Sequence, residues 1–240
     1  MAHLTAPPTA AAVRPRRRRA LAAAPALAAA LGLAAAGLAA TPAELSGRLG
    51  LAGRGARAGD PSAAVVYFEP AAGARAPAPR TLTIETRDKQ FSPRVLAVPR
   101  GSRVRFPNRD PILHNVFSVS RGNAFDLGLL GEGPGADAVF EQPGLVRIYC
   151  NVHHGMVAYV MVVDTPHYAS PDAAGRFRLA GLPAGPGKLT AWHEQTDPAT
   201  LELTLPAPGP VEVELGVSRP RVPRHLNKLG KSYGRGRDRY

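Results

Sequence analysis

The stretch that most constrains this chain is residues 146–156, V-R-I-Y-C-N-V-H-H-G-M. It holds the single cysteine of the sequence, Cys150, with His153 three residues further on and Met156 three residues after that. Apolar and polar residues alternate before Cys150, and a second apolar run follows at residues 156–163, so we expect a strand on each side. A thiol, an imidazole and a thioether therefore share one short loop between two predicted strands.

A second imidazole would complete a donor set of one cysteine, two histidines and one methionine. Such sets hold copper in electron-transfer sites, with the methionine as a weak axial ligand. The candidate is His114, which begins a predicted strand within F-P-N-R-D-P-I-L-H-N-V-F-S-V at residues 106–119. Zinc can also bind a Cys-His-His site, but Met156 favours copper.

The His114–Asn115 pair on one predicted strand, followed at a distance by C-x-x-H-x-x-M, resembles the type 1 copper site of the cupredoxins. Within this plastocyanin-like family, the loop spacing is most similar to that of amicyanin. The resemblance covers residues 81–164 and implies a Greek-key β-sandwich that binds one type 1 copper ion. The copper ligands that it implies are His114, Cys150, His153 and Met156.

The resemblance also gives roles to two neighbours of these ligands. It implies that Asn115 ties the His114 strand to the cysteine loop. The family often has proline after the second ligand of the loop, where this chain has His154, but the spacing favours His153 as the ligand. Because His153 is on the loop, we expect it to be the point where electrons leave the site.

The rest of the chain indicates a second, smaller β-sandwich. The pattern D-x-x-G-x-F-x-L, followed by L-P-x-G-x-x-x-L, resembles carboxypeptidase regulatory-like domains, which are transthyretin-like sandwiches. Such a domain normally begins with a strand like A-V-V-Y-F-E, which this chain carries at residues 64–69 instead. We therefore hypothesise that residues 64–69 pair with the C-terminal strands and that the cupredoxin region is inserted between them.

The predicted fold class is thus all-β, and 25 glycines and 25 prolines suit short strands joined by many turns. The predicted divisions are a signal peptide (1–40), a linker (41–62), a cupredoxin domain (63–165), a regulatory-like sandwich (166–217) and a basic tail (218–240).

The formal charge of +12 belongs to the two ends of the chain. Residues 1–40 carry five arginines and no acidic residue, residues 218–240 carry eight basic residues and one aspartate, and the middle is neutral. Basic residues followed by an alanine-rich apolar run predict an export signal, with an uncleaved membrane anchor as the alternative. We therefore expect a periplasmic or secreted protein, for which nucleic acid is not an expected partner.

Export limits the roles that the lone cysteine can have, because a free exposed thiol is easily oxidised in an oxidising compartment. Cys150 is then either an inert core residue or a metal ligand, and the flanking His and Met favour the ligand. The basic tail, predicted to be mobile, suggests an acidic redox protein or an anionic lipid surface as partner.

The leading prediction is an exported type 1 copper protein that transfers single electrons and is not an enzyme. Two alternatives remain open. One is a copper carrier or storage protein, and the other is a structural β-sandwich module with incidental metal binding.

Overall fold

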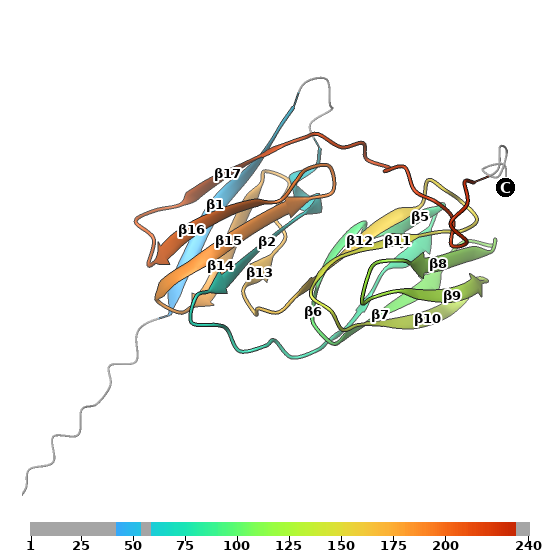
Figure 1. The fold of residues 1–240 in the computed structure, drawn as a ribbon, viewed down its shortest axis with the longest axis horizontal. Helices are drawn as coiled ribbons and strands as arrows, with labels where there is room; N and C mark the ends of the chain where they lie inside the picture. Colours follow the sequence, from blue (N-terminus) through green and yellow to red (C-terminus); the bar gives the residue numbers. More distant parts are fainter. Residues whose placement is uncertain (1–41, 54–58, 234–240) are drawn as a thin grey trace, which may run out of the picture. The chain divides into compact units, whose positions relative to one another are not determined.

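A computed structural model of the protein describes residues 42–53 and 59–233, and within them the chain is all-β (Figure 1). The one helical element in this part of the chain is the short 3-10 helix Pro61–Ala63. The predicted fold class is therefore confirmed. None of the described helices is long and apolar enough to cross a membrane. The predicted signal peptide lies outside the described residues.

Residues 81–163 form two five-stranded sheets, here called the central sandwich. One sheet has the order β10-β7-β4-β5, with β3 beside β7. Its strands are β3 (Thr81–Thr83), β4 (Glu85–Arg87), β5 (Gln90–Ser92), β7 (Ser102–Asn108) and β10 (Gly133–Phe140). The other sheet has the order β6-β12-β11-β8-β9. Its strands are β6 (Val95–Pro99), β8 (His114–Ser118), β9 (Phe125–Leu130), β11 (Gly144–Tyr149) and β12 (Val157–Val163).

Alternating apolar residues of both sheets meet in one core, which is what a period of two produces when each sheet buries one face. Phe106 and Phe140 come from the first sheet, and Val146 and Ile148 from the second. Cys150 belongs to the same buried cluster. The predicted metal loop therefore begins at the edge of a packed core rather than in an exposed connection.

The remaining strands form what we call the outer sandwich, with sheet orders β14-β1-β17 and β13-β2-β15-β16. Its strands are β1 (Ala43–Ala52), β2 (Ala64–Pro70), β13 (Tyr168–Ala169), β14 (Arg176–Leu182), β15 (Gly185–His193), β16 (Ala199–Leu205) and β17 (Val211–Gly216). Leu45 and Leu49 from β1, Phe68 from β2 and Leu189 from β15 share its core.

Strand β2 pairs with β15 from Pro70↔Gly187 to Ala64↔His193. This is the pairing that the insertion hypothesis requires, because residues 64–69 lie in a sheet of the outer sandwich and not in the sheets around the metal loop. The predicted domain of residues 63–165 therefore has its first strand in the outer sandwich, which is the arrangement that the insertion hypothesis expects.

The linker predicted at residues 41–62 is wrong for residues 43–52, which form β1 between β14 and β17. Leu45, Leu49 and Leu51 alternate as in a strand, but Gly47 takes the place of the apolar residue that should stand between Leu45 and Leu49. A β-carbon on Gly47 would lie 2.3 Å from the carbonyl oxygen of Val211 and 2.6 Å from the Phe177 ring. Because the neighbouring strands fill that space, a glycine stands there instead of an apolar side chain. The apolar alternation from which a strand is predicted is therefore interrupted.

Residues of the two sandwiches also share a third buried cluster. Tyr149 and Tyr159 contribute from the central sandwich, and Val65 and Trp192 from the outer one. The rings of Tyr159 and Trp192 pack edge to face with centroids 5.4 Å apart.

The prediction of a mobile tail is wrong for residues 218–233. These residues fold back on the metal loop, where the backbone amide of Lys228 donates to Asn151 Oδ1 at 3.1 Å and the Tyr233 hydroxyl donates to the Cys150 carbonyl at 3.0 Å. Aromatic and amide contacts hold this segment in place. The basic composition of the tail gave no indication of them.

Candidate metal centre

Three adjacent strands of one sheet carry the predicted ligands. His114 is the first residue of β8, Cys150 follows the last residue of β11, and Met156 precedes the first residue of β12. The loop between β11 and β12 is closed by two backbone hydrogen bonds, from Cys150 N–H to the Met156 carbonyl at 3.3 Å and from Met156 N–H to the His153 carbonyl at 3.1 Å. The sheet therefore fixes the loop at both ends.

The donor atoms of His114, Cys150 and His153 all lie within 4.8 Å of one another. The two histidines approach through their Nδ1 atoms, which are 3.2 Å apart, and Cys150 Sγ lies 3.9 Å from His153 Nδ1. All three residues are buried, with 0%, 0% and 4% of their surface exposed. The structure thus brings three of the four predicted ligands together around one point.

Met156, the fourth predicted ligand, lies at the end of the metal loop, next to the first residue of β12. It is 1% exposed and belongs to the same buried cluster as Cys150. With His153, it also lines a depression of about 240 Å³ at the surface. His154, the competing imidazole of the loop, is exposed. Both the C-x-x-H spacing and the burial of the side chain therefore favour His153 over His154 as the ligand.

Three backbone amides point at the cysteine sulfur. The N–H groups of Asn115, Val152 and His153 donate to Cys150 Sγ at 3.5, 3.4 and 3.5 Å. Hydrogen bonds of this kind restrain a ligand atom and tune a metal bound to it. The loop and β8 therefore hold the sulfur in place from two sides.

Asn115 does tie the His114 strand to the cysteine loop, but through its backbone N–H. Its side-chain Nδ2 instead donates to Asp126 Oδ1 at 2.8 Å and to the Gly128 carbonyl at 2.6 Å. These bonds hold β8 against β9 and so fix the amide that faces the sulfur.

A carboxylate that the sequence analysis did not single out holds His114. Asp110 Oδ2 lies 2.9 Å from His114 Nε2. A proton on Nε2 makes His114 the donor and leaves the lone pair of Nδ1 directed at the site. Metal-binding histidines typically have such a partner, which fixes the ring and raises its basicity. The only signal in the sequence was an acidic residue four positions before the candidate ligand.

The environment keeps this pair in the states that metal binding needs. Burial lowers the pKa of His114 below its ordinary value, although the hydrogen bond to Asp110 opposes the shift. Burial works against ionisation of Asp110, but hydrogen bonds from the backbone of Lys89 and Asp88 and from His114 outweigh it and lower its pKa. A neutral imidazole beside an ionised carboxylate is the form that coordinates a cation.

No known protein family and no curated protein matches the sequence. Several solved structures are similar to part of the chain. The purple cupredoxin from Nitrosopumilus maritimus is 26% identical, with a TM-score of 0.31, and the match covers 34% of this chain and 99% of that one. A pseudoazurin from Sinorhizobium meliltoi is 19% identical, with a TM-score of 0.31, over 36% of this chain and 76% of that one.

The third is the Cu-containing nitrite reductase NirK from Thermus scotoductus SA-01, which is 26% identical with a TM-score of 0.33. That match covers 39% of this chain and 24% of the reductase. Each similarity is thus confined to little more than a third of the present chain, and the chemistry of the site has to follow from its own donor atoms.

Those donor atoms fit copper. A buried thiol with three amide donors and two imidazoles converging through Nδ1 offers soft and borderline ligands, which suit both Cu(I) and Cu(II). Oxygen-rich sites for calcium or magnesium look different, because here the Asp110 carboxylate contacts a histidine and stands behind it.

Proposed function

We propose that this chain is an exported cupredoxin-like protein that binds one type 1 copper ion through His114, Cys150, His153 and Met156 and transfers single electrons. The observation that carries the proposal is the convergence of two Nδ1 atoms on a buried sulfur that already accepts three amide hydrogen bonds. When bound, copper would supply the chemistry by alternating between Cu(II) and Cu(I).

The chain's own contribution is to hold the ligands still. An electron carrier works best when its ligands move little between the two oxidation states. Both ends of the metal loop are fixed by β11 and β12, and His114 is fixed by Asp110. Each ligand is thus restrained by the protein before any metal arrives, as a preorganised site requires.

His153 is the best point for electrons to leave. It is the histidine ligand that lines the surface depression, whose other lining residues are Lys89, His154, Gly155 and Met156. His114, in contrast, is completely buried. A lysine at this rim supports the proposal of an acidic redox partner, whose approach it would favour by electrostatic attraction.

We further propose that the protein is not an enzyme and that it works in the periplasm or outside the cell. A buried site with four protein ligands leaves no position for a substrate, in contrast to catalytic sites with an open position. The likeness of the outer sandwich to carboxypeptidase regulatory-like domains remains a proposal that rests on its sequence pattern.

The test is a visible absorption spectrum of the purified protein during titration with Cu(II), beside Cys150→Ser. The proposal predicts an intense thiolate-to-copper band at one copper per chain in the wild type and its loss in the variant. A colourless protein that binds Cu(I) would favour the storage alternative. If neither copper state binds, the metal proposal fails.

A further inference from the structure

The C-terminal segment, residues 218–233 and here called the strap, runs from the outer sandwich to the metal loop. Its beginning is held by the outer sandwich, where the backbone N–H groups of Ser218 and Arg219 both donate to the Gln195 carbonyl at 3.0 Å. Further on, a turn at residues 227–231 is closed by the Asn227 side chain, whose Oδ1 accepts from the amides of Leu229 and Lys231 at 3.0 Å. The strap therefore has local structure of its own.

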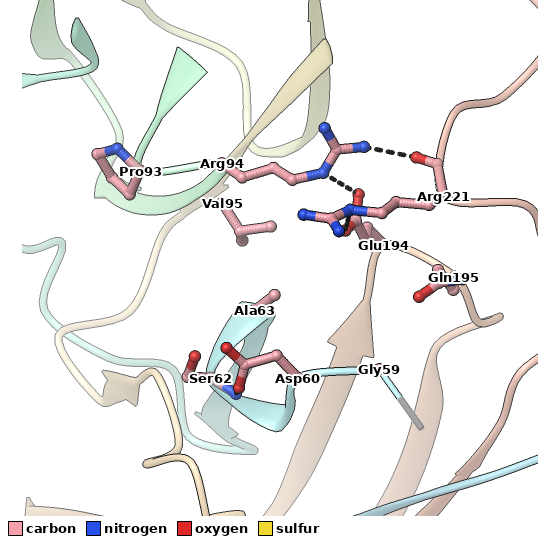
Figure 2. A pocket seen from close by; sticks show the side chains of 10 residues that line it. All are labelled: Gly59, Asp60, Ser62, Ala63, Pro93, Arg94, Val95, Glu194, Gln195 and Arg221. Carbon is pink, nitrogen blue, oxygen red and sulfur yellow. Dashed lines mark hydrogen bonds and ion pairs between the residues drawn. The ribbon is translucent and has the colours of Figure 1, made fainter. Parts of the chain in front are cut away.

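The strap is also fixed near its beginning by a cluster of charged side chains around the buried Glu194. Figure 2 shows the guanidinium of Arg94 between the carboxylate of Glu194 and the carbonyl oxygen of Arg221. The first of these contacts is 2.6 Å and the second 2.5 Å, and only 4% of the Glu194 side chain is exposed. A third bond of the same guanidinium, 2.9 Å to the Val157 carbonyl, reaches the first residue of β12. The arginine thus links the strap to the end of the metal loop.

The far end of the strap contacts the cysteine directly. The Tyr233 hydroxyl donates to the Cys150 carbonyl oxygen at 3.0 Å, across 83 residues of sequence. The ring of Tyr233 lies 5.9 Å from the ring of His154 and 5.3 Å from that of His225. His225 in turn stacks on Tyr149, with centroids 4.1 Å apart and planes 15° apart. Strap side chains therefore contact residues before and after Cys150 in the sequence.

A second route leads from the strap to the cysteine sulfur. Lys228 Nζ lies 2.5 Å from Asp126 Oδ2, and Asp126 Oδ1 accepts from Asn115 Nδ2 at 2.8 Å. The backbone N–H of the same Asn115 is a donor to Cys150 Sγ. Since the Lys228 amide also donates to Asn151, one strap residue contacts both the metal loop and β9, the strand that holds the Asn115 side chain.

We propose that the strap is a built part of the metal centre, in which Tyr233 and Lys228 are positioning residues that hold the Cys150 loop closed. That the loop binds copper rests on the proposed function above. That Tyr233 and Lys228 hold the loop closed does not depend on it. Loss of either contact should let the loop open more often, because local opening depends on the few bonds that are broken in the open form.

The first test uses the metal-free full-length protein, in which Cys150 is the only thiol. The rate of alkylation by iodoacetamide at fixed pH reports how often the loop opens. We expect Tyr233→Phe to raise this rate about three- to ten-fold, the equivalent of one lost hydrogen bond. Lys228→Gln should raise it about two-fold, since its ion pair is partly exposed. The matched controls are Tyr168→Phe and Lys188→Gln in the outer sandwich, which should react like the wild type.

The second test uses the copper-loaded protein. Tyr233→Phe should have a lower reduction potential than the wild type, because a looser cover admits water, which stabilises the more highly charged Cu(II). An alkylation rate equal to that of the wild type in both strap variants would overturn the proposal. If the wild type takes up no copper, the proposed function fails while the alkylation rates still decide the role of the strap.

Discussion

At the scale of single residues, the contact between Asp110 and His114 matters most for the metal. Asp110 accepts from His114 at one oxygen and from the backbone N–H groups of Asp88 and Lys89 at 2.7 and 2.9 Å. Asp88 and Lys89 both have positive φ, 53° and 56°, so the turn places two amides on one carboxylate at the expense of backbone strain. The carboxylate is thus held in the place where it can orient the ligand.

We therefore predict that Asp110→Asn lowers the affinity for Cu(II) by about 10- to 100-fold, the usual effect of losing the partner of a metal-binding histidine. An amide also turns an NH₂ group toward one of the two backbone donors, which it cannot satisfy. Competition against a chelator of known affinity measures the change. Asp137→Asn, which removes the partly exposed carboxylate that pairs with Arg105, is the control, and an affinity for Asp110→Asn equal to that of this control would contradict the prediction.

Single residues also show which parts of the candidate site could be predicted from the sequence. Cys150, His153 and Met156 share one short motif, so their spacing alone identified them. Asp110 lies only four residues before His114, but its place depends on two backbone amides from the distant turn at Asp88 and Lys89. Lys228 and Tyr233 reach the site from a segment 78 or more residues further along the chain than Cys150, and no local pattern records how that segment folds back.

At the scale of elements, β1 is where the sequence and the structure differ most. Alternation predicted the strands around the metal loop because each apolar position is occupied by a large side chain. In β1 that alternation is interrupted by Gly47, where β17 and the Phe177 ring occupy the space. A glycine required by close packing thus resembles a glycine of a linker.

We predict that Gly47→Ala destabilises the protein by about 1–3 kcal/mol, the range for forcing an extra methyl group into a packed core. Gly50→Ala lies on the same strand, and a β-carbon there would meet nothing within 4 Å. This control should change the free energy of unfolding by no more than about 0.5 kcal/mol. Denaturant unfolding of both variants measures the difference, and equal midpoints would mean that residues 43–52 are not a central strand.

At the scale of the whole molecule, the charged side chains around the buried Glu194 connect three segments that are distant in sequence. Glu194 follows β15 of the outer sandwich, Arg94 precedes β6 of the central one, and Arg221 belongs to the strap. The Arg94 and Glu194 side chains are 18% and 4% exposed, and Arg221 Nε approaches the same carboxylate at 3.8 Å. Removal of the acid would leave a guanidinium without its counter-charge in a largely buried place.

Glu194→Gln should therefore lower the free energy of unfolding by roughly 3 kcal/mol, since breaking a buried ion pair from one side leaves the other charge uncompensated. Chemical denaturation followed by tryptophan fluorescence is suitable, because Trp192 is two residues away. Glu44→Gln breaks the exposed pair with Arg178 and should leave the midpoint unchanged. Equal midpoints for the two variants would show that the Glu194 cluster does not stabilise the fold.

The proposed function is reversible single-electron transfer at one copper ion, and a spectroelectrochemical titration of the copper-loaded protein tests it most directly. We expect the thiolate-to-copper band to disappear on reduction by one electron per chain and to return fully on reoxidation, with no loss of metal. A band that does not return, or copper that is released on reduction, would contradict electron transfer and favour a copper carrier instead.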